Sequence, residues 1–384
     1  MSVTVPAGFR ASGVTAGLKA SGKPDLALVV NDGPLAVAAA VYTSNRCVAH
    51  PVRWSREVTA DGSVRAVVLN SGGANCYTGP DGYATTAATA ARVGAGVGCP
   101  ATDIVVCSTG LIGDLLDREK LAAGVDAAVA ALSGDGGRAA AEAIMTTDTH
   151  PKTVVRTAPG GWSVAGMAKG AGMLAPGLAT MLVVLTTDAD VDAATCAAAL
   201  RAATRTTFDR LDSDGCMSTN DTVLLMASGA AGVTPAAAEF AEAVRAVCHD
   251  LTMLLLSDAE GSEHDITITV RGAASEDDAV EVGRAVARSN LFKCAVFGRD
   301  PNWGRILAAA GTTGAAFDPD AIDVAMNGVW ICRGGQPGES RDLVDLTPRQ
   351  VEVTVDLHAG AETATVWTND LTHAYVHENS AYST

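Results

Sequence analysis

MAKGAGMLAPGLATMLVVLTTD, residues 167–188, runs from a glycine-rich loop directly into an apolar strand at residues 181–185. Thr180 stands at the junction, preceded by the small or flexible residues Gly177, Leu178 and Ala179. A threonine hydroxyl is a weak nucleophile unless a base lies beside it. Cleavage before Thr180 would free an α-amino group, whose pKa of about 7.7 to 8.0 lies close to working pH. The bond between Ala179 and Thr180 is therefore a candidate self-cleavage site, with Thr180 as nucleophile and its own amine as base.

The same residues also fit a simpler interpretation. β-Branched residues favour strands, so a threonine after Gly-Leu-Ala can merely begin a buried strand. The local pattern leaves both interpretations open, and other parts of the chain have to decide between them.

Six further motifs occur along the chain: SGGAN at 71–75, CSTGLIG at 107–113, AIMTTDT at 143–149, FDRLDSDGCMSTNDT at 208–222, DPNWGR at 300–305 and NDLTHAYVHENSAYST at 369–384. They resemble, in the same order, the signatures of the ornithine acetyltransferase family, also called glutamate N-acetyltransferase or bifunctional arginine biosynthesis protein. Residues 167–188 closely resemble that family's cleavage-site signature. Because the motifs span nearly the whole chain, the resemblance is specific and favours self-cleavage over a plain strand start.

The resemblance implies an α/β (α+β) fold with two facing β-sheets flanked by helices, as in the ornithine acetyltransferases and the self-processing aminopeptidases. Cleavage would divide the chain into an α chain, residues 1–179, and a β chain, residues 180–384. The residues themselves predict three pairs of adjacent strands. The runs 26–30 and 36–42 flank Asn-Asp-Gly-Pro, the runs 351–357 and 363–367 flank Ala-Gly, and the runs 154–157 and 162–167 flank Pro-Gly-Gly.

The composition limits the classes of protein to which the chain can belong. A chain of 384 residues that is 48% hydrophobic can form two or three units with ample cores. A net charge of −16 opposes nucleic-acid binding. No apolar run reaches the roughly 18 residues of a membrane span, and the N-terminus lacks a signal-like segment, so we expect a cytoplasmic protein. Nine cysteines without a Cys-x-x-Cys pair predict free thiols, mostly buried, rather than zinc ligands or disulfides.

Thr109 and Gly110 follow an expected strand at residues 104–107. The resemblance implies that this Thr-Gly pair is the oxyanion hole, which donates hydrogen bonds to the negative charge that develops on the acetyl oxygen. Without the resemblance, the same two residues would fit a helix N-cap.

The resemblance also implies a set of substrate-binding residues: Thr146, Lys169, Thr180, Glu260, Asn379 and Thr384. A lysine beside the nucleophile would supply the cation that an anionic substrate needs in an acidic protein. The carboxylate of Glu260 would hold the side-chain amine of ornithine. The polar loop at residues 212–221 can brace the active threonine, although ordinary turn chemistry explains it equally well.

The reaction implied by the resemblance is a ping-pong transfer of the acetyl group from N2-acetylornithine to glutamate, in arginine biosynthesis, through an acetyl-Thr180 intermediate. Acetyl-CoA is a second candidate donor, which would make the enzyme bifunctional, and no cofactor is needed. We expect the two chains to stay together, as a heterotetramer of two α and two β chains.

Two other classes of protein are retained as alternatives. A nicotinamide-dependent oxidoreductase would use Gly170-Ala171-Gly172 after a strand, but Pro176 stands where the phosphate-binding helix should begin. A noncatalytic binding protein would keep the fold and stay uncut. His373 and His377 have the spacing of a two-histidine metal site without a third ligand, so we expect no metal.

Overall fold

The computed structural model describes residues 2–174 and 181–381. Residues 175–180, which include the predicted cleavage site and Thr180, and residues 382–384, which include Thr384, lie outside the described part. Among the described residues, no helix is long and apolar enough to cross a membrane.

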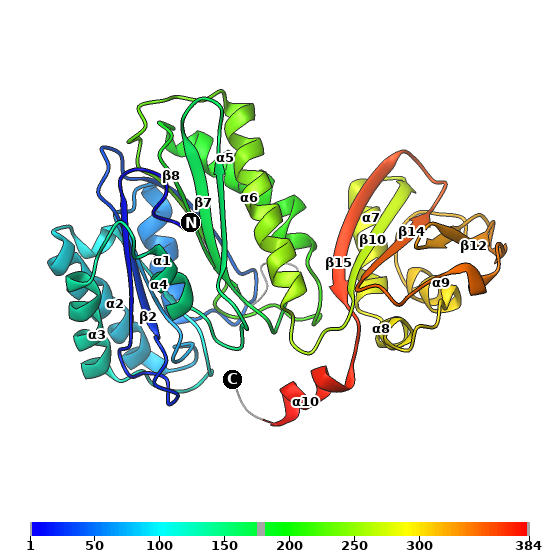
Figure 1. The fold of residues 1–384 in the computed structure, drawn as a ribbon, viewed down its shortest axis with the longest axis horizontal. Coiled ribbons are helices and arrows are strands. Elements are labelled where there is room, and N and C mark those ends of the chain that lie inside the picture. Colours follow the sequence, from blue (N-terminus) through cyan, green and yellow to red (C-terminus); the bar gives the residue numbers. More distant parts are fainter. Residues whose placement is uncertain (1, 175–180, 382–384) are drawn as a thin grey trace.

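Two β-sheets form the centre of the larger unit (Figure 1). The first sheet has the order β1 (Phe9–Val14), β2 (Leu26–Asn31), β4 (Ala66–Asn70) and β5 (Ile104–Ser108). The second has the order β3 (Val37–Tyr42), β9 (Thr222–Ala227), β8 (Leu182–Thr187), β7 (Ser163–Lys169) and β6 (Lys152–Thr157). Their inner faces share one apolar cluster, in which Leu69 of the first sheet lies with Met167 and Val184 of the second. The alternation of side chains across each strand produces this contact, because every second residue points inward.

Helices cover the outer face of each sheet. α2 (Gly79–Val97) and α3 (Arg118–Ala130) pack on the first sheet, and α5 (Ala193–Thr206) and α6 (Ala237–Ser257) on the second. The shorter α1 (His50–Val58) and α4 (Gly137–Ala143) add buried residues to the cluster between the sheets. The prediction of two facing sheets flanked by helices is therefore confirmed.

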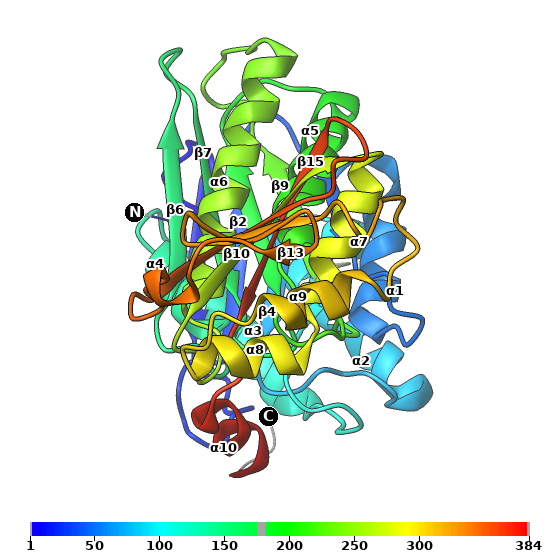
Figure 2. The same cartoon turned by 90° about the vertical axis from the view of Figure 1, so that its right-hand side faces the viewer.

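A third sheet follows, which the sequence did not predict as a separate unit. Its order is β13 (Gln336–Pro337), β12 (Val329–Arg333), β11 (Asp323–Met326), β14 (Gln350–Asp356), β10 (Asp265–Ala273) and β15 (Glu362–Asn369). Its apolar face forms its own core with α7 (Glu276–Ala287), α8 (Asn290–Phe297) and α9 (Trp303–Ala310). α10 (His373–Ala381) comes last and lies below both units (Figures 1 and 2). Four short 3-10 turns complete the described part, at Thr59–Asp61, Ala101–Asp103, Phe208–Arg210 and Arg341–Leu343.

The first predicted strand pair is wrong. β2 pairs with β1 and β4, whereas β3 pairs with β9 in the other sheet. Residues 31–34 carry the chain between the sheets, and the side-chain amide of Asn31 donates to the carbonyls of Leu35 and Ala227, at 3.1 and 3.2 Å. Gly33 is required at this crossing, because a Cβ there would lie 2.6 Å from Ser228. The Asn-Asp-Gly-Pro sequence marks a change of direction, which a crossing between sheets needs as much as a hairpin does.

The second predicted pair is also wrong. β14 and β15 follow one another in the chain, but β10 lies between them, parallel to β14 and antiparallel to β15. Apolar alternation identifies each strand without revealing a central strand contributed by a distant part of the sequence.

The predicted boundary between the α and β chains falls between two neighbouring strands. β7 and β8 pair antiparallel from Val164 with Thr187 to Lys169 with Leu182. A chain cut there would leave β3, β6 and β7 in the first segment and β8 and β9 in the second. The division into residues 1–179 and 180–384 itself stays a prediction.

Candidate active site

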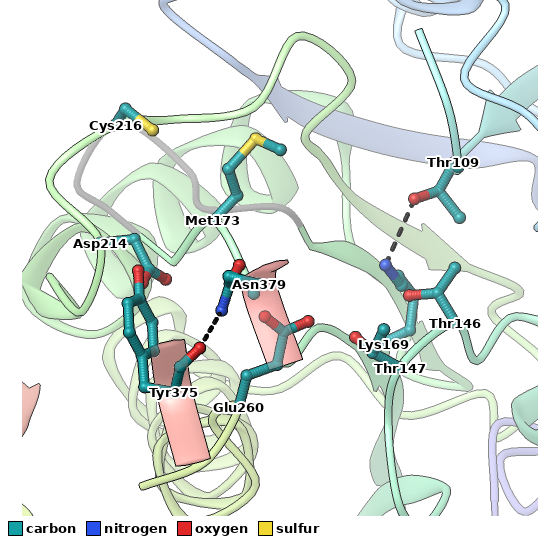
Figure 3. Close-up of a pocket in the computed structure, with 12 residues that line it drawn as sticks. Thr109, Thr146, Thr147, Lys169, Met173, Asp214, Cys216, Glu260, Tyr375 and Asn379 are labelled. Carbon is teal, nitrogen blue, oxygen red and sulfur yellow. Dashed lines mark hydrogen bonds between the residues drawn. The ribbon is translucent and has the colours of Figure 1, made fainter. Parts of the chain in front are cut away.

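A cavity of about 230 Å³ lies between loops of the larger unit and α10 (Figure 3). Six of the residues expected from the sequence line it: Thr109, Gly110, Thr146, Lys169, Glu260 and Asn379. They come from five separate parts of the chain, so the fold brings together what the sequence spreads over 271 positions, from 109 to 379. The other candidates, Ala179, Thr180 and Thr384, lie outside the described residues.

Thr109 and Gly110 form the turn that follows β5. The N–H of Thr109 donates to the carbonyl of Asn70 at 2.9 Å, so only the hydroxyl of Thr109 remains to act in the cavity. Gly110 has φ +129°, and a Cβ there would lie 2.7 Å from the backbone nitrogen of Gly73. This position therefore needs glycine, because another side chain would be strained and would push the neighbouring loop away.

Lys169 is the last residue of β7 and is only 2% exposed. Its Nζ donates to the hydroxyl oxygen of Thr109 at 3.2 Å, so the hydroxyl proton of Thr109 must point elsewhere and is free to donate. Burial lowers the pKa of Lys169, and the negative charge of Asp148 opposes that shift. The lysine thus orients the threonine and brings a cation to this end of the cavity.

Asp148 holds this end together and was not singled out from the sequence. Its Oδ1 accepts from Lys152 Nζ at 2.6 Å and from the N–H of Gly170 at 2.7 Å. Burial would raise the pKa of Asp148, but the charges of Lys169 and Lys152 hold it at about 2. Asp148 therefore stays ionised and fixes the backbone immediately after Lys169.

Thr146 begins the segment that contains Asp148. Its N–H donates to Asp148 Oδ2 at 2.9 Å, which ties the residue to the same carboxylate that fixes Gly170. Its side chain lines the cavity beside that of Thr147 (Figure 3).

Glu260 lies just beyond the end of α6, and its N–H donates to the carbonyl of Ala171 at 2.9 Å. Burial raises the pKa of Glu260, hydrogen bonds from Thr147 and Asn379 oppose the shift, and the charge of Asp214 adds to it. A Cβ on Gly172 would lie 2.6 Å from the Glu260 carboxylate, so the glycine-rich loop makes the room for this side chain.

The loop at residues 212–221 contacts the turn at Thr109 and the start of the strand that follows the predicted cleavage site, whereas its predicted contact with Thr180 lies outside the described residues. The side-chain amide of Asn220 donates to the carbonyls of Ala74 and Ser108, at 2.6 and 2.8 Å, and so joins the loop to the turn at Thr109. Asp221 is fully buried and its Oδ1 accepts from the N–H of Met181 at 3.2 Å. Burial raises the pKa of Asp221 well above its usual value.

Sequence reasoning missed further residues that line the cavity: Thr147, Gly172, Met173, Asp214, Cys216 and Tyr375. Asp214 and Cys216 stand inside the motif at residues 208–222, which was the available signal for them. Tyr375 likewise stands inside the motif at residues 369–384. Its contact with Asp214, 161 positions away, could not be predicted from either motif.

The segment proposed for a dinucleotide does not have the required structure. A dinucleotide-binding unit needs parallel strands joined through a helix that begins at the glycines. Here β7, which precedes the glycines, pairs antiparallel with β8, which follows them. The described residues also contain no group of three His, Cys, Asp or Glu side chains able to hold a metal ion.

Comparison with known proteins gives consistent matches over the full length. A family model described as the ArgJ family matches residues 10–384. A Streptomyces avermitilis protein named arginine biosynthesis bifunctional protein ArgJ is 65% identical over 383 residues, with 100% of both chains covered. A Thermobifida fusca protein of the same name is 62% identical over 384 residues, again with 100% of both chains covered.

Two solved structures are also similar. One is an ornithine acetyltransferase from Mycobacterium tuberculosis complexed with ornithine, 53% identical, covering 47% of this chain and 96% of that chain with a TM-score of 0.45. The other is an arginine biosynthesis bifunctional protein from Bacillus halodurans, 36% identical, covering 51% and 97% with a TM-score of 0.49.

Proposed function

The chain belongs to the ArgJ family of arginine biosynthesis acetyltransferases, and from this premise we propose that it transfers the acetyl group of N2-acetylornithine to glutamate through an ester on Thr180. One observation carries the proposal. Six residues that the sequence assigns to oxyanion stabilisation and substrate binding line a single cavity. A shared location is what a common catalytic role requires.

The charges of the cavity support this substrate. Lys169 supplies a cation beside Thr109, and Glu260 supplies a carboxylate. N2-acetylornithine carries an α-carboxylate near its acetyl group and an ammonium at the end of its side chain. Lys169 would bind the carboxylate and Glu260 the ammonium, with Thr146 and Asn379 beside them and Thr384 as a further contact.

Self-cleavage prepares the nucleophile. Hydrolysis of the bond between Ala179 and Thr180 consumes one water and leaves a carboxylate on Ala179 and a free amine on Thr180. An amine of that kind has a pKa of about 7.7 to 8.0 and can accept the hydroxyl proton of the same residue near neutral pH.

Acetyl transfer then takes two steps. The Thr180 oxygen attacks the acetyl carbonyl, its proton passes to the Thr180 amine, and the Thr109 hydroxyl and Gly110 N–H stabilise the oxyanion. The C–N bond breaks, and ornithine leaves with that proton on its α-nitrogen. The amine of glutamate attacks the ester, its surplus proton returns to Thr180, and N-acetylglutamate leaves.

The same ester could be formed from acetyl-CoA, with loss of the thiol, and the word "bifunctional" in the relatives' names supports this second activity. We further propose that the two chains remain together as a heterotetramer of two α and two β chains, in the cytoplasm.

The test begins with the intact mass of the denatured protein, wild type beside Thr180→Ala and Thr180→Ser. We expect the wild type to separate into residues 1–179 and 180–384, of roughly 18 and 21 kDa from the 38.8 kDa total, with the larger beginning at Thr180. Thr180→Ala should stay whole, whereas Thr180→Ser keeps a hydroxyl and should be cut.

Transfer is then followed by the formation of N-acetylglutamate from N2-acetylornithine and glutamate. Wild type should form the product, and Thr180→Ala should not. A wild type that stays uncut after long incubation would refute the N-terminal threonine mechanism and favour a noncatalytic binding protein.

A further inference from the structure

Asp214 is a second carboxylate in the cavity, and nothing described so far gives it a role. It lies in the loop before β9, is half-buried and lines the cavity together with Glu260. Figure 3 shows Asp214, Tyr375 and Asn379 on the side away from Thr109 and Lys169. The cavity therefore has a cation at one end and carboxylates toward the other.

The carboxylate of Asp214 is held rigidly by neutral donors. The N–H of Leu174 donates to its Oδ2 and the hydroxyl of Tyr375 to its Oδ1, both at 2.7 Å. An ionised carboxylate has about four acceptor positions, so two remain for a ligand. Among the described residues, no Lys, Arg or His side chain forms an ion pair with Asp214.

Lys293 is the cation whose charge acts on Asp214, but it forms no ion pair with it and also interacts with other carboxylates. The ammonium of Lys293 donates to the carbonyl of Ser213, and the charge of Asp214 acts on it most strongly, ahead of those of Asp212 and Asp370. Lys293 is not among the residues that line the cavity. Lys293 therefore balances the charge of Asp214 only in part and from outside the cavity, and a cationic ligand can balance the remainder from inside it.

The two carboxylates act on each other across the cavity. The charge of Asp214 makes ionisation of Glu260 less favourable, in addition to burial, and Glu378 on α10 acts in the same direction. Like charges in one site disfavour each other's ionisation, and a bound cation relieves that repulsion. A ligand with a positively charged side chain fits this end better than a neutral or negative one.

We propose that Asp214 is a specificity-determining residue: together with Glu260 it binds the side-chain ammonium of the acetyl donor, and it selects that donor against amino acids with uncharged side chains. This inference rests on the proposed function, which it deepens. Leu174 and Tyr375 orient the carboxylate, and Asp214 is the group that touches the substrate.

The proposal has an opposite consequence for the acceptor. In a ping-pong reaction, glutamate enters the cavity that ornithine has left, and its side-chain carboxylate then meets Asp214. Asp214 therefore favours binding of the donor and opposes binding of the acceptor. A change at this residue should shift the two KM values in opposite directions.

The experiment compares Asp214→Asn with Tyr375→Phe. The first variant keeps the shape and removes the charge, whereas the second removes one orienting hydrogen bond and keeps the charge. Calorimetry measures binding of ornithine and of norvaline, which has the same carbon chain without the ammonium. We expect Asp214→Asn to lose roughly tenfold to a hundredfold in ornithine affinity, the value of a charged hydrogen bond.

Norvaline binding should not change in Asp214→Asn, and Tyr375→Phe should still prefer ornithine. In steady-state assays, Asp214→Asn should raise the KM for N2-acetylornithine much more than it lowers kcat, and it should lower the KM for glutamate. Asp214→Glu, which restores the charge, should recover part of the preference for ornithine and serves if Asp214→Asn does not fold.

Three results would overturn the inference: a wild type that does not prefer ornithine to norvaline, an Asp214→Asn that loses both ligands equally, or a Tyr375→Phe that loses the preference as fully as Asp214→Asn. Failure of the proposed function is a different observation, because a wild type that prefers ornithine but forms no N-acetylglutamate would keep the subsite and refute the transfer.

Discussion

At the scale of single residues, the hydrogen bonds of Thr109 determine what it can contribute. Its N–H is bound to Asn70 and its hydroxyl oxygen accepts from Lys169, which leaves one donor, the hydroxyl proton. A substitution that removes only that hydroxyl therefore tests the oxyanion assignment without changing the backbone of the turn.

Thr109→Val should keep the backbone of the turn, because the two side chains have nearly the same shape, although it also removes the acceptor of the buried Lys169 ammonium. Its kcat for acetyl transfer should fall roughly a hundredfold to a thousandfold, the usual effect of losing one oxyanion donor. Thr109→Ser retains the hydroxyl and should keep most of the activity. Steady-state kinetics of both variants decide the matter, and equal activity in Thr109→Val and wild type would remove Thr109 from the oxyanion hole.

Asp221 predicts a pH dependence of stability. Burial raises the pKa of its carboxyl in the folded protein, so ionisation opposes folding at every pH above the unfolded pKa of about 3.9. Asp221→Asn removes this cost and keeps an oxygen to accept from Met181. Its free energy of unfolding, relative to the wild type, should therefore increase as the pH rises from about 4 toward the folded pKa.

Chemical denaturation at several pH values measures this difference. Both proteins should carry Thr180→Ala, so that each is a single chain throughout. A variant that becomes less stable than its parent with rising pH would show that the Asp221 carboxylate is ionised and paired in the folded protein.

Individual site residues were predictable only where a motif surrounded them. Thr109, Lys169 and Glu260 stand in recognisable segments and do line the cavity, although their roles stay predictions. Asp148 and Tyr375 also stand inside motifs, at residues 143–149 and 369–384, but the motifs do not reveal their partners. Asp148 accepts from the N–H of Gly170, and Tyr375 donates to Asp214, 161 positions away. Sequence patterns record neighbours along the chain, so contacts of this kind leave no local trace.

At the scale of elements, α10 is unusual because it shapes the cavity without being part of a core. None of its residues is buried, and it is attached through the hydroxyl of Thr372, which donates to the carbonyl of Gly261 at 2.5 Å, and through the ring contact of His373 with Phe297. It nevertheless supplies Tyr375 and Asn379 to the cavity.

Deletion of residues 373–384 should therefore separate stability from activity. We expect the melting temperature to change by no more than about 3 °C, since little apolar surface is lost. Acetyl transfer should fall at least about tenfold through the loss of Asn379 and the hydrogen bond to Asp214. Deletion of residues 382–384 alone is the matched control, and it tests Thr384 separately. Full activity without residues 373–384 would exclude α10 from the site.

For helices and strands, as for single residues, the sequence predicts local features but not contacts between distant segments. α5 begins at Ala193, where the Asp192 side chain caps the first turn by accepting from the N–H of Thr195 at 2.7 Å. A helix cap and an amphipathic pattern depend on residues close together in the chain, so both can be identified from the sequence. The pairing of β2 with β4, or of β10 with β14, depends on distant segments, and both adjacency predictions failed there.

At the scale of the whole molecule, the predicted cut would pass through the five-stranded sheet. Residues 1–179 contain β3, β6 and β7, and residues 180–384 contain β8 and β9, which carry much of the apolar surface between the two sheets. Residues 180–384 contain the whole core of the third sheet, but the core between the two facing sheets is divided between the segments.

Separate expression should show this dependence. Residues 1–179 alone should aggregate or remain unfolded, because the missing β8 and β9 leave the apolar cluster between the sheets open. Coexpression with residues 180–384 should give a complex that elutes as one species in size-exclusion chromatography. A stable, monodisperse product from residues 1–179 alone would contradict this expectation and would indicate an independent domain.

The strand order β3, β9, β8, β7, β6 has one more consequence. If the chain is cut between β7 and β8, the two strands of the second segment lie sandwiched between strands of the first. Neither polypeptide can then be withdrawn without breaking hydrogen bonds along both of its borders. Subunit exchange between mature molecules would require unfolding, and refolding would change from a unimolecular to a bimolecular process that depends on concentration. The mature enzyme would be kinetically trapped, durable once assembled and difficult to rebuild once lost.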